Sequence, residues 1–192
     1  MQKWILASQS PRRRELLSRL VSEFEVIVDD SDEVLIPDEL PEKTVRRLAE
    51  EKARNVAEKI QNDALILAAD TVVVLNNQIL GKPKDEEDAF HMLSALSGNW
   101  HQVFTGIAVL DAKTGRCETA VEMTKVQFRA LTEAEIRRYI ESKEPMDKAG
   151  AYGIQDKGAL LVEGIEGDYF NVVGLPLCRL GTLLRESFQI EW

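Results

Sequence analysis

The fold is decided by the stretch WILASQSPRRRELL, which spans residues 4–17. Its first four residues are apolar and predict a short buried strand. Ser10 followed by Pro11 predicts a helix start, because serine caps helix N-termini and proline fits the first helical position. Arg12 and Arg13 then fall in the first helical turn, where the helix dipole disfavours cations but suits a bound polyanion. A solvated helix start is the alternative, but this placement of charge favours a phosphate site.

Strands and helices alternate along the rest of the chain. Apolar residues at helical spacing predict one helix at residues 42–60 and another after Pro176. Capping residues predict two more helices, at 85–98 and 132–140. Strands are expected at residues 24–28, 64–75, 78–80, 103–110 and 118–128. This order predicts an α/β fold, a mixed twisted sheet flanked by helices with a central cleft, in a single domain spanning residues 1–192.

The composition is that of an ordinary globular protein, with 44% hydrophobic and 30% charged residues. No apolar run approaches the ~20 residues that span a bilayer, and the N-terminus lacks a secretory pattern. Cys117 and Cys178 lie far apart without metal-ligand spacing, which favours reduced thiols in a cytoplasmic protein. His91 and His101 also lack metal spacing, and we expect a helix-surface residue and a structural hydrogen-bonder, respectively.

The charge balance limits the class of partner. The formal net charge is -9 at pH 7, whereas a protein that binds a nucleic-acid polymer needs a basic surface. A bound polyanion would therefore be small and would enter a local basic pocket. This favours a nucleotide as the ligand, with no nucleic-acid polymer and no membrane as partners.

Asp70 is the strongest catalytic candidate from the residues alone. It follows the apolar run at residues 64–69, where an unpaired carboxylate is costly unless it meets a metal ion, a cation or solvent in a crevice. Such a crevice is the usual ligand site of an open α/β sheet. Lys52 falls on the apolar stripe of the helix at 42–60, and its spacing fits equally a lysine that snorkels outward and one that meets an anion. Glu33 gains no functional weight from its spacing.

Two further segments carry residues suited to phosphate. One is GKP at residues 81–83, which holds Lys82 between glycine and proline. The other is PMDKAGAYGIQ at residues 145–155, whose small residues would let backbone amides approach a ligand closely. Lys148 would add a charge there, and Gln155 a donor and an acceptor able to contact a base edge. Neither a P-loop nor a Rossmann glycine motif is present.

Six blocks of the sequence together resemble the Maf family, in the family's order and over nearly the whole chain. The blocks are LASQSPRR (residues 6–13), ADTV (69–72), GKP (81–83), LSG (96–98), DKAGAYGIQ (147–155) and NVVGLP (171–176). The resemblance implies a nucleoside triphosphate pyrophosphatase, which releases a nucleoside monophosphate and pyrophosphate. It also implies a fold similar to that of the inosine triphosphate pyrophosphatases, a divalent metal cofactor (Mg²⁺ or Mn²⁺) and a homodimer.

The block at residues 147–155 resembles the branch of the family that acts on dTTP and UTP, and differs from the branch that acts on 7-methyl-GTP. By this resemblance Arg12, Thr71 and Gln155 occupy specificity positions, and Asp70 that of the proton acceptor. The implied substrate-binding residues are Ser8, Arg12, Arg13, Lys52, Thr71, Lys82, Lys148 and Gln155, and the implied metal ligands are Glu33 and Asp70.

Three alternatives stay open at this point. Asp70 either activates a water molecule or ligates the metal, since both roles need an ionised carboxylate near the α-phosphate. Modified pyrimidine triphosphates such as 5-methyl-UTP and pseudo-UTP are alternative substrates. The alternative function is a nucleotide-binding regulator of cell division with little turnover, because members of the family are linked by name to arrest of septum formation. Metal-dependent pyrophosphate release separates the enzyme from the regulator.

Overall fold

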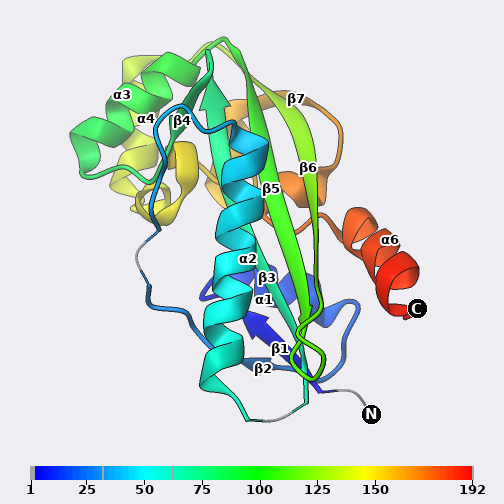
Figure 1. The fold of residues 1–192 in the computed structure, drawn as a ribbon. Coiled ribbons are helices and arrows are strands. Elements are labelled where there is room, and N and C mark those ends of the chain that lie inside the picture. The colour runs from blue at the N-terminus through cyan, green and yellow to red at the C-terminus, as the bar shows by residue number, and fades with distance from the viewer. Residues whose placement is uncertain (1–2, 32, 62, 192) are drawn as a thin grey trace. The chain divides into compact units, whose positions relative to one another are not determined.

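The computed structural model describes residues 3–31, 33–61 and 63–191. Within these residues, seven strands form one mixed sheet in the order β2-β1-β3-β5-β6-β7, with β4 paired to β3 (Figure 1). The strands are β1 (Trp4–Ala7), β2 (Glu25–Val26), β3 (Leu65–Leu75), β4 (Gln78–Leu80), β5 (Trp100–Asp111), β6 (Cys117–Phe128) and β7 (Val162–Glu166). The α-helices are α1 (Pro11–Ser18), α2 (Pro41–Lys59), α3 (Glu86–Leu96), α4 (Glu133–Glu141), α5 (Tyr169–Val173) and α6 (Leu177–Phe188). The predicted α/β class is confirmed.

The described residues form two compact units. The first unit draws on Met1–Asp70, Thr105–Glu122 and Gly174–Trp192, and the second on Thr71–Phe104 and Met123–Val173. Strands β3, β5 and β6 contribute residues to both units. The single domain and the central cleft stay predictions.

In the first unit, the strand and helix expected at the start of the chain are both present. β1 is buried along its whole length and pairs in parallel with β3, with Ala7 opposite Ala68. The side chain of Ser10 accepts a hydrogen bond from the backbone N–H of Arg13 (3.4 Å), and Pro11 is the first helical residue of α1. The chain therefore leaves the sheet after Ala7, while the neighbouring strand β3 continues.

Helix α2 packs on the sheet of the first unit through its predicted apolar stripe. Its residues Ala49, Ala53 and Val56 lie in one hydrophobic core with Ile5, Ala7, Ile66, Ala68, Ala108 and Leu110. The backbones of α2 and β5 lie so close together that β5 requires a glycine at position 106. A Cβ on Gly106 would lie 2.2 Å from the carbonyl oxygen of Val45 in α2. This packing sets the position of every other side chain on α2, including Lys52.

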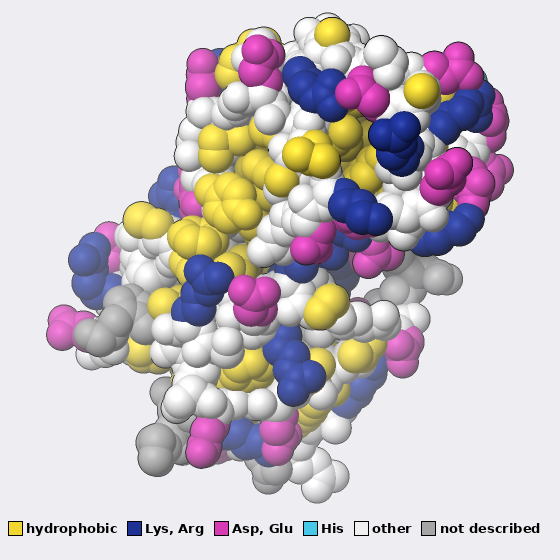
Figure 2. Space-filling view, turned by 180° about the vertical axis from the view of Figure 1, so that it is seen from behind, with side chains coloured by type: hydrophobic (Ala, Val, Ile, Leu, Met, Phe, Trp, Pro, Cys, Tyr) yellow, Lys and Arg dark blue, Asp and Glu magenta, His cyan; other side chains and the backbone are white. Residues whose placement is uncertain are grey.

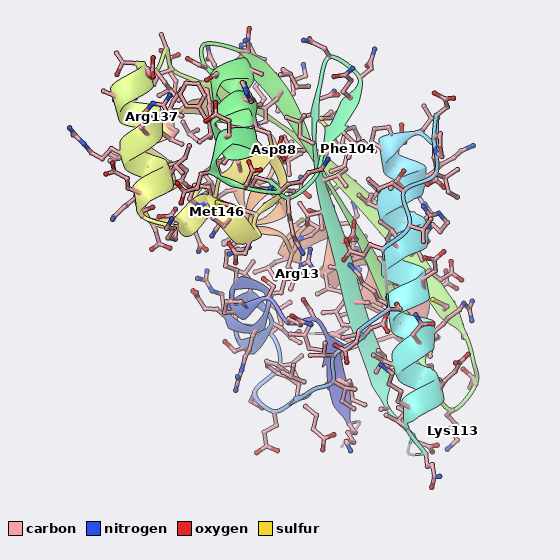
Figure 3. The ribbon with its side chains drawn as sticks, turned by 90° about the vertical axis from the view of Figure 1, so that its left-hand side faces the viewer. Arg13, Asp88, Phe104, Lys113, Arg137 and Met146 are labelled. Atoms are coloured by element: carbon pink, nitrogen blue, oxygen red, sulfur yellow. The ribbon has the colours of Figure 1, made fainter. Side chains whose placement is uncertain are left out.

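In the second unit, local sequence rules also hold. β3 and β4 form an antiparallel hairpin at residues 76–77, where both asparagines have a positive φ. Thr132 and Glu135 form the predicted capping box of α4. Helices α3 and α4 lie side by side, and Arg137 of α4 lies over the ring of Phe90 of α3, 4.4 Å from its centroid (Figure 3).

The chain between α4 and α6 is more ordered than the partly extended stretch expected there. It contains the 3₁₀ helices η1 (Glu144–Asp147), η2 (Ala149–Ala151) and η3 (Asp156–Leu161) in addition to β7 and α5. Several of its turns occur at residues with a positive φ that are not glycine, namely Lys143, Ala151 and Asp156. Rules that expect glycine or asparagine at such positions cannot find these turns. The strand expected at residues 24–28 is also shorter, because β2 has only two residues.

Charged side chains of both signs lie on the surface. Figure 2 shows lysine and arginine side chains interspersed with acidic side chains on the face it displays. Among the described residues, none of the helices is both long and apolar enough to cross a membrane. Cys117 and Cys178 are free thiols. The cytoplasmic location stays a prediction.

Candidate active site

Asp70 lies in the interior of β3, where it is 5% exposed. The parallel neighbour β1 ends at Ala7, opposite Ala68, so Asp70 lies beyond the carboxyl end of that strand. Ligands of α/β sheets bind outside the carboxyl ends of parallel strands. The catalytic role of Asp70 itself stays a prediction.

Lys52 of α2 joins Asp70 to a second carboxylate. Its Nζ lies 2.6 Å from Oδ1 of Asp70 and 2.7 Å from Oε1 of Glu33. The side chains of Lys52 and Asp70 are only 16% and 7% exposed, respectively, and a charge so far from water needs a partner. The ammonium of Lys52 therefore meets two carboxylates of the chain, the buried Asp70 and the exposed Glu33. Its role in binding a substrate anion stays a prediction.

Glu33 and Asp70 have the carboxylate oxygens that suit a divalent cation such as Mg²⁺ or Mn²⁺. Both offer carboxylate oxygens, and both lie against the same lysine ammonium. Within the described ranges there is no group of three or more His, Cys, Asp or Glu side chains able to hold a metal ion. Magnesium in nucleotide enzymes commonly takes one or two protein carboxylates and completes its shell with phosphate oxygens and water. The residues present suit that arrangement.

Arg13 (labelled in Figure 3) ties three segments of the first unit together. Its Nε donates to the carbonyl oxygen of Gly174 (2.8 Å), and its Nη1 donates to that of Ala69 (2.8 Å) and to Oγ of Ser8 (3.4 Å). Burial lowers the pKa of Arg13 and the Asp70 carboxylate raises it, and a guanidinium keeps its charge at neutral pH in either case. Arg13 therefore holds the backbone next to Asp70. The sequence carried no signal for these distant carbonyl partners.

Ser8 and Arg12 complete the candidates of the first unit. The hydroxyl of Ser8 also accepts a hydrogen bond from the backbone N–H of Ser10 (3.2 Å), which shapes the turn between β1 and α1. Arg12 is half-buried in the first turn of α1. The structure thus brings Ser8, Arg13, Glu33, Lys52 and Asp70 into one connected set of contacts, and Arg12 adjoins it along the chain.

The remaining candidates, Thr71, Lys82, Lys148 and Gln155, belong to the second unit. The two phosphate-suited segments meet there, because the backbone N–H of Gly150 donates to the carbonyl oxygen of Gly81 (3.0 Å). Lys148 is 12% exposed, and its Nζ donates to Oδ1 of Asp147 (2.7 Å) and to the carbonyl oxygen of Glu144 (2.5 Å). Lys82 is exposed, whereas Thr71 and Gln155 are half-buried.

Sequence reasoning missed the side chains that shape residues 144–158. The carboxylate of Glu144 accepts hydrogen bonds from the hydroxyl of Tyr139 (3.0 Å) and from the backbone N–H of Gly158 (3.1 Å). The same hydroxyl accepts from the backbone N–H of Gly153 (3.2 Å). A Cβ on Gly158 would lie 1.8 Å from the carbonyl oxygen of Gly153, so the two backbones are in direct contact. None of these residues stands in a pattern that predicts its partner.

Comparison with known proteins identifies the family. The model of the family described as Maf-like protein matches residues 3–187 of the chain. The chain belongs to the Maf family. A dTTP/UTP pyrophosphatase from Clostridium botulinum is 52% identical to this chain, and the alignment covers 97% of each chain. A dTTP/UTP pyrophosphatase from Acetivibrio thermocellus is 53% identical, and the alignment covers 97% of this chain and 96% of the relative. Another from Alkaliphilus metalliredigens is 51% identical over 100% of this chain and 99% of the relative.

Solved structures of other proteins are more distantly similar to this Maf-family chain. A HAM1 protein from Coxiella burnetii has a TM-score of 0.49 and 18% identity, covering 67% of this chain and 73% of its own. A nucleoside-triphosphatase, or dITP/XTP pyrophosphatase, from Mycobacterium abscessus has a TM-score of 0.41 and 15% identity, covering 68% and 76%. Similarities this remote carry no conclusion about the reaction.

Proposed function

We propose that this Maf-family chain is a dTTP/UTP pyrophosphatase, which hydrolyses dTTP and UTP to the nucleoside monophosphate and pyrophosphate. Relatives that share 51–53% of its residues over nearly their whole length carry that name. The observation in the structure that best supports catalysis is the buried carboxylate of Asp70 held by Lys52. A protein that only binds a triphosphate has no need for a carboxylate beside anionic phosphates.

In the proposed reaction, the oxygen of a water molecule forms a bond to the α-phosphorus, and the bond from that phosphorus to the bridging oxygen breaks. Asp70 accepts the proton of the water, and pyrophosphate leaves with the bridging oxygen. Lys52 holds the carboxylate of Asp70 in place. A Mg²⁺ or Mn²⁺ ion would be held by Glu33, and by Asp70 in the alternative role of that carboxylate, and would neutralise charge on the triphosphate.

The other candidate residues have binding roles in this proposal. Arg12, Thr71 and Gln155 contact the pyrimidine nucleotide and select it. The residues that bind or orient the triphosphate are Ser8, Arg13, Lys52, Lys82 and Lys148. The homodimer implied by the family resemblance also belongs to this proposal, and light scattering of the purified protein would test it.

Pyrophosphate release tests the function directly. With Mg²⁺ or Mn²⁺ and a panel of dTTP, UTP, CTP, dATP, GTP and 7-methyl-GTP, we expect turnover of dTTP and UTP well above the rest. Chelation of the metal by EDTA should abolish that turnover, because the metal would supply charge neutralisation that the reaction requires. Preference for 7-methyl-GTP would contradict the assignment to the dTTP/UTP branch. Binding of nucleotides without turnover would favour the regulator.

Replacing Arg13 by lysine should lower kcat/KM for dTTP by about tenfold, because an ammonium cannot bridge two carbonyl oxygens as the planar guanidinium does. The backbone beside Asp70 would then lose one of its supports. Steady-state kinetics of Arg13→Lys beside Arg14→Lys measures the effect, since Arg14 is the exposed neighbour in α1. Equal activity of the two variants would contradict a role for Arg13 beside Asp70.

A further inference from the structure

His101 and Tyr152 form a buried polar pair in the second unit. Nε2 of His101 lies 2.7 Å from the hydroxyl oxygen of Tyr152, and the residues are 3% and 5% exposed. Both rings pack edge-on against Phe128 of β6, with centroids 5.1 and 4.7 Å from its own. His101 stands near the start of β5, so the pair connects Tyr152 to two strands of the sheet.

The pair is neutral and shares one hydrogen bond. Burial lowers the pKa of His101 to about 4, and burial also raises the pKa of Tyr152, so the imidazole is uncharged and the phenol keeps its proton at neutral pH. Nδ1 of His101 is buried and has no hydrogen-bond partner among the described residues. An unpaired buried polar atom costs stability. The hydrogen bond of Nε2 satisfies the buried hydroxyl of Tyr152, which a phenylalanine at position 101 would leave without this partner.

Tyr152 is the side chain that anchors the segment between Lys148 and Gln155. The backbone on its N-terminal side is left-handed at two consecutive residues, Gly150 (φ 68) and Ala151 (φ 59). Alanine in that region is strained, so surrounding contacts must hold it there. Ala151 is fully buried, and the ring of Tyr152 is enclosed by the aromatic rings described above. Loss of this anchor would leave the conformation of the segment under-determined.

We propose that His101 is a positioning residue for nucleotide binding: its hydrogen bond to Tyr152 fixes the segment that presents Lys148 and Gln155 to the substrate. This inference rests on the proposed function and deepens it. His101 does not touch the substrate in this scheme. Its effect passes through Tyr152 to the two side chains that flank it in the sequence.

The position of Lys148 supports the same scheme. Its stem lies against Gly153, the residue after Tyr152, because a Cβ on Gly153 would lie 2.8 Å from Cε of Lys148. Its ammonium donates hydrogen bonds to the carbonyl oxygen of Glu144 and to the carboxylate of Asp147, which fix its direction. A shift of the backbone at Tyr152 therefore moves the surface on which Lys148 rests.

The test removes the hydrogen bond and keeps the ring. In Tyr152→Phe we expect KM for dTTP to rise by about tenfold while kcat changes less than twofold, because one orienting hydrogen bond is lost. His101→Phe should raise KM similarly, and the double variant should be no worse than either single variant, since both changes remove the same bond. Tyr169→Phe and His91→Phe are matched controls, because both side chains are exposed and lie in the same unit.

Calorimetric binding of dTMP gives a readout that does not need turnover, and its Kd should rise with KM in the same variants. KM and Kd within twofold of wild type in both single variants, with only a lower Tm, would overturn the proposal and leave a purely structural pair. Additive effects in the double variant would overturn it as well. Absence of pyrophosphate release by the wild-type protein would instead reject the proposed function, and dTMP binding would still decide the role of the pair.

Discussion

Asp70→Asn is expected to lower kcat for dTTP hydrolysis by about 100-fold or more, with little change in KM. Asparagine has nearly the shape of aspartate, so the packing within β3 is kept. The amide cannot accept the proton of the attacking water, and it is a weaker ligand for a divalent cation. Steady-state pyrophosphate release over a range of dTTP concentrations separates kcat from KM.

The matched control is Asp63→Asn, which removes an aspartate of the first unit that pairs with Lys113 (2.9 Å) at a site where both side chains are 69% exposed. Such surface pairs contribute little to stability, so this variant should match the wild type. Near-wild-type kcat in Asp70→Asn would contradict both roles proposed for the carboxylate. A loss of kcat that higher Mn²⁺ concentrations restore would favour the metal ligand over the proton acceptor.

Local rules predicted the parts of the fold that depend on neighbours in the sequence. Serine capping located the start of α1, and helical spacing of apolar residues located the buried face of α2. The Thr132 capping box located α4 in the same way. In each case the stabilising contact joins residues a few positions apart, so the sequence pattern contains both partners.

The candidate site was predictable only in part, for the same reason. A carboxylate next to an apolar run can be recognised in the sequence, because burying its charge beside those neighbours costs free energy. This pattern identified Asp70. Glu33 is a loop residue whose contact with Lys52 crosses 19 positions, and its spacing alone gave it no weight. The carbonyl partners of Arg13 lie 56 and 161 positions away. Any carbonyl in the chain can accept such a bond, so no residue type marks the partner.

The segment at residues 144–158 shows a second limit of sequence reasoning. Its backbone is left-handed at Ala151, where local preference argues against that conformation. Tertiary contacts outweigh that preference here: Glu144 accepts the N–H of Gly158, and Tyr139 accepts that of Gly153. Positions at which the fold overrides local preference are often functional. This segment also carries the block that resembles the dTTP/UTP branch of the family.

Acid should destabilise the fold through His101. Its pKa is about 4 in the folded protein, against an ordinary value of 6.5, because burial penalises the imidazolium. Between these two values the unfolded chain binds a proton that the folded chain does not, so stability is lost as pH falls below about 6.5 and is unaffected above it. Linkage gives a loss of about 2 kcal/mol in the free energy of unfolding between pH 7 and pH 5.

Urea unfolding at pH 7, 6 and 5 measures this loss in the wild type and in His101→Gln. Working at pH 5 and above limits the contribution of carboxylates such as Glu135, whose pKa falls to about 2 from 4.5 because Arg129 and Thr132 bond to its charged form. The loss in the free energy of unfolding between pH 7 and pH 5 should be smaller by about 2 kcal/mol in His101→Gln than in the wild type. In His91→Gln this loss should equal that of the wild type. If His101→Gln is too unstable, proton NMR of the wild type gives the same answer. Titration of the His101 imidazole near pH 6.5 would contradict the burial of its charge, and with it the neutral pair that holds Tyr152.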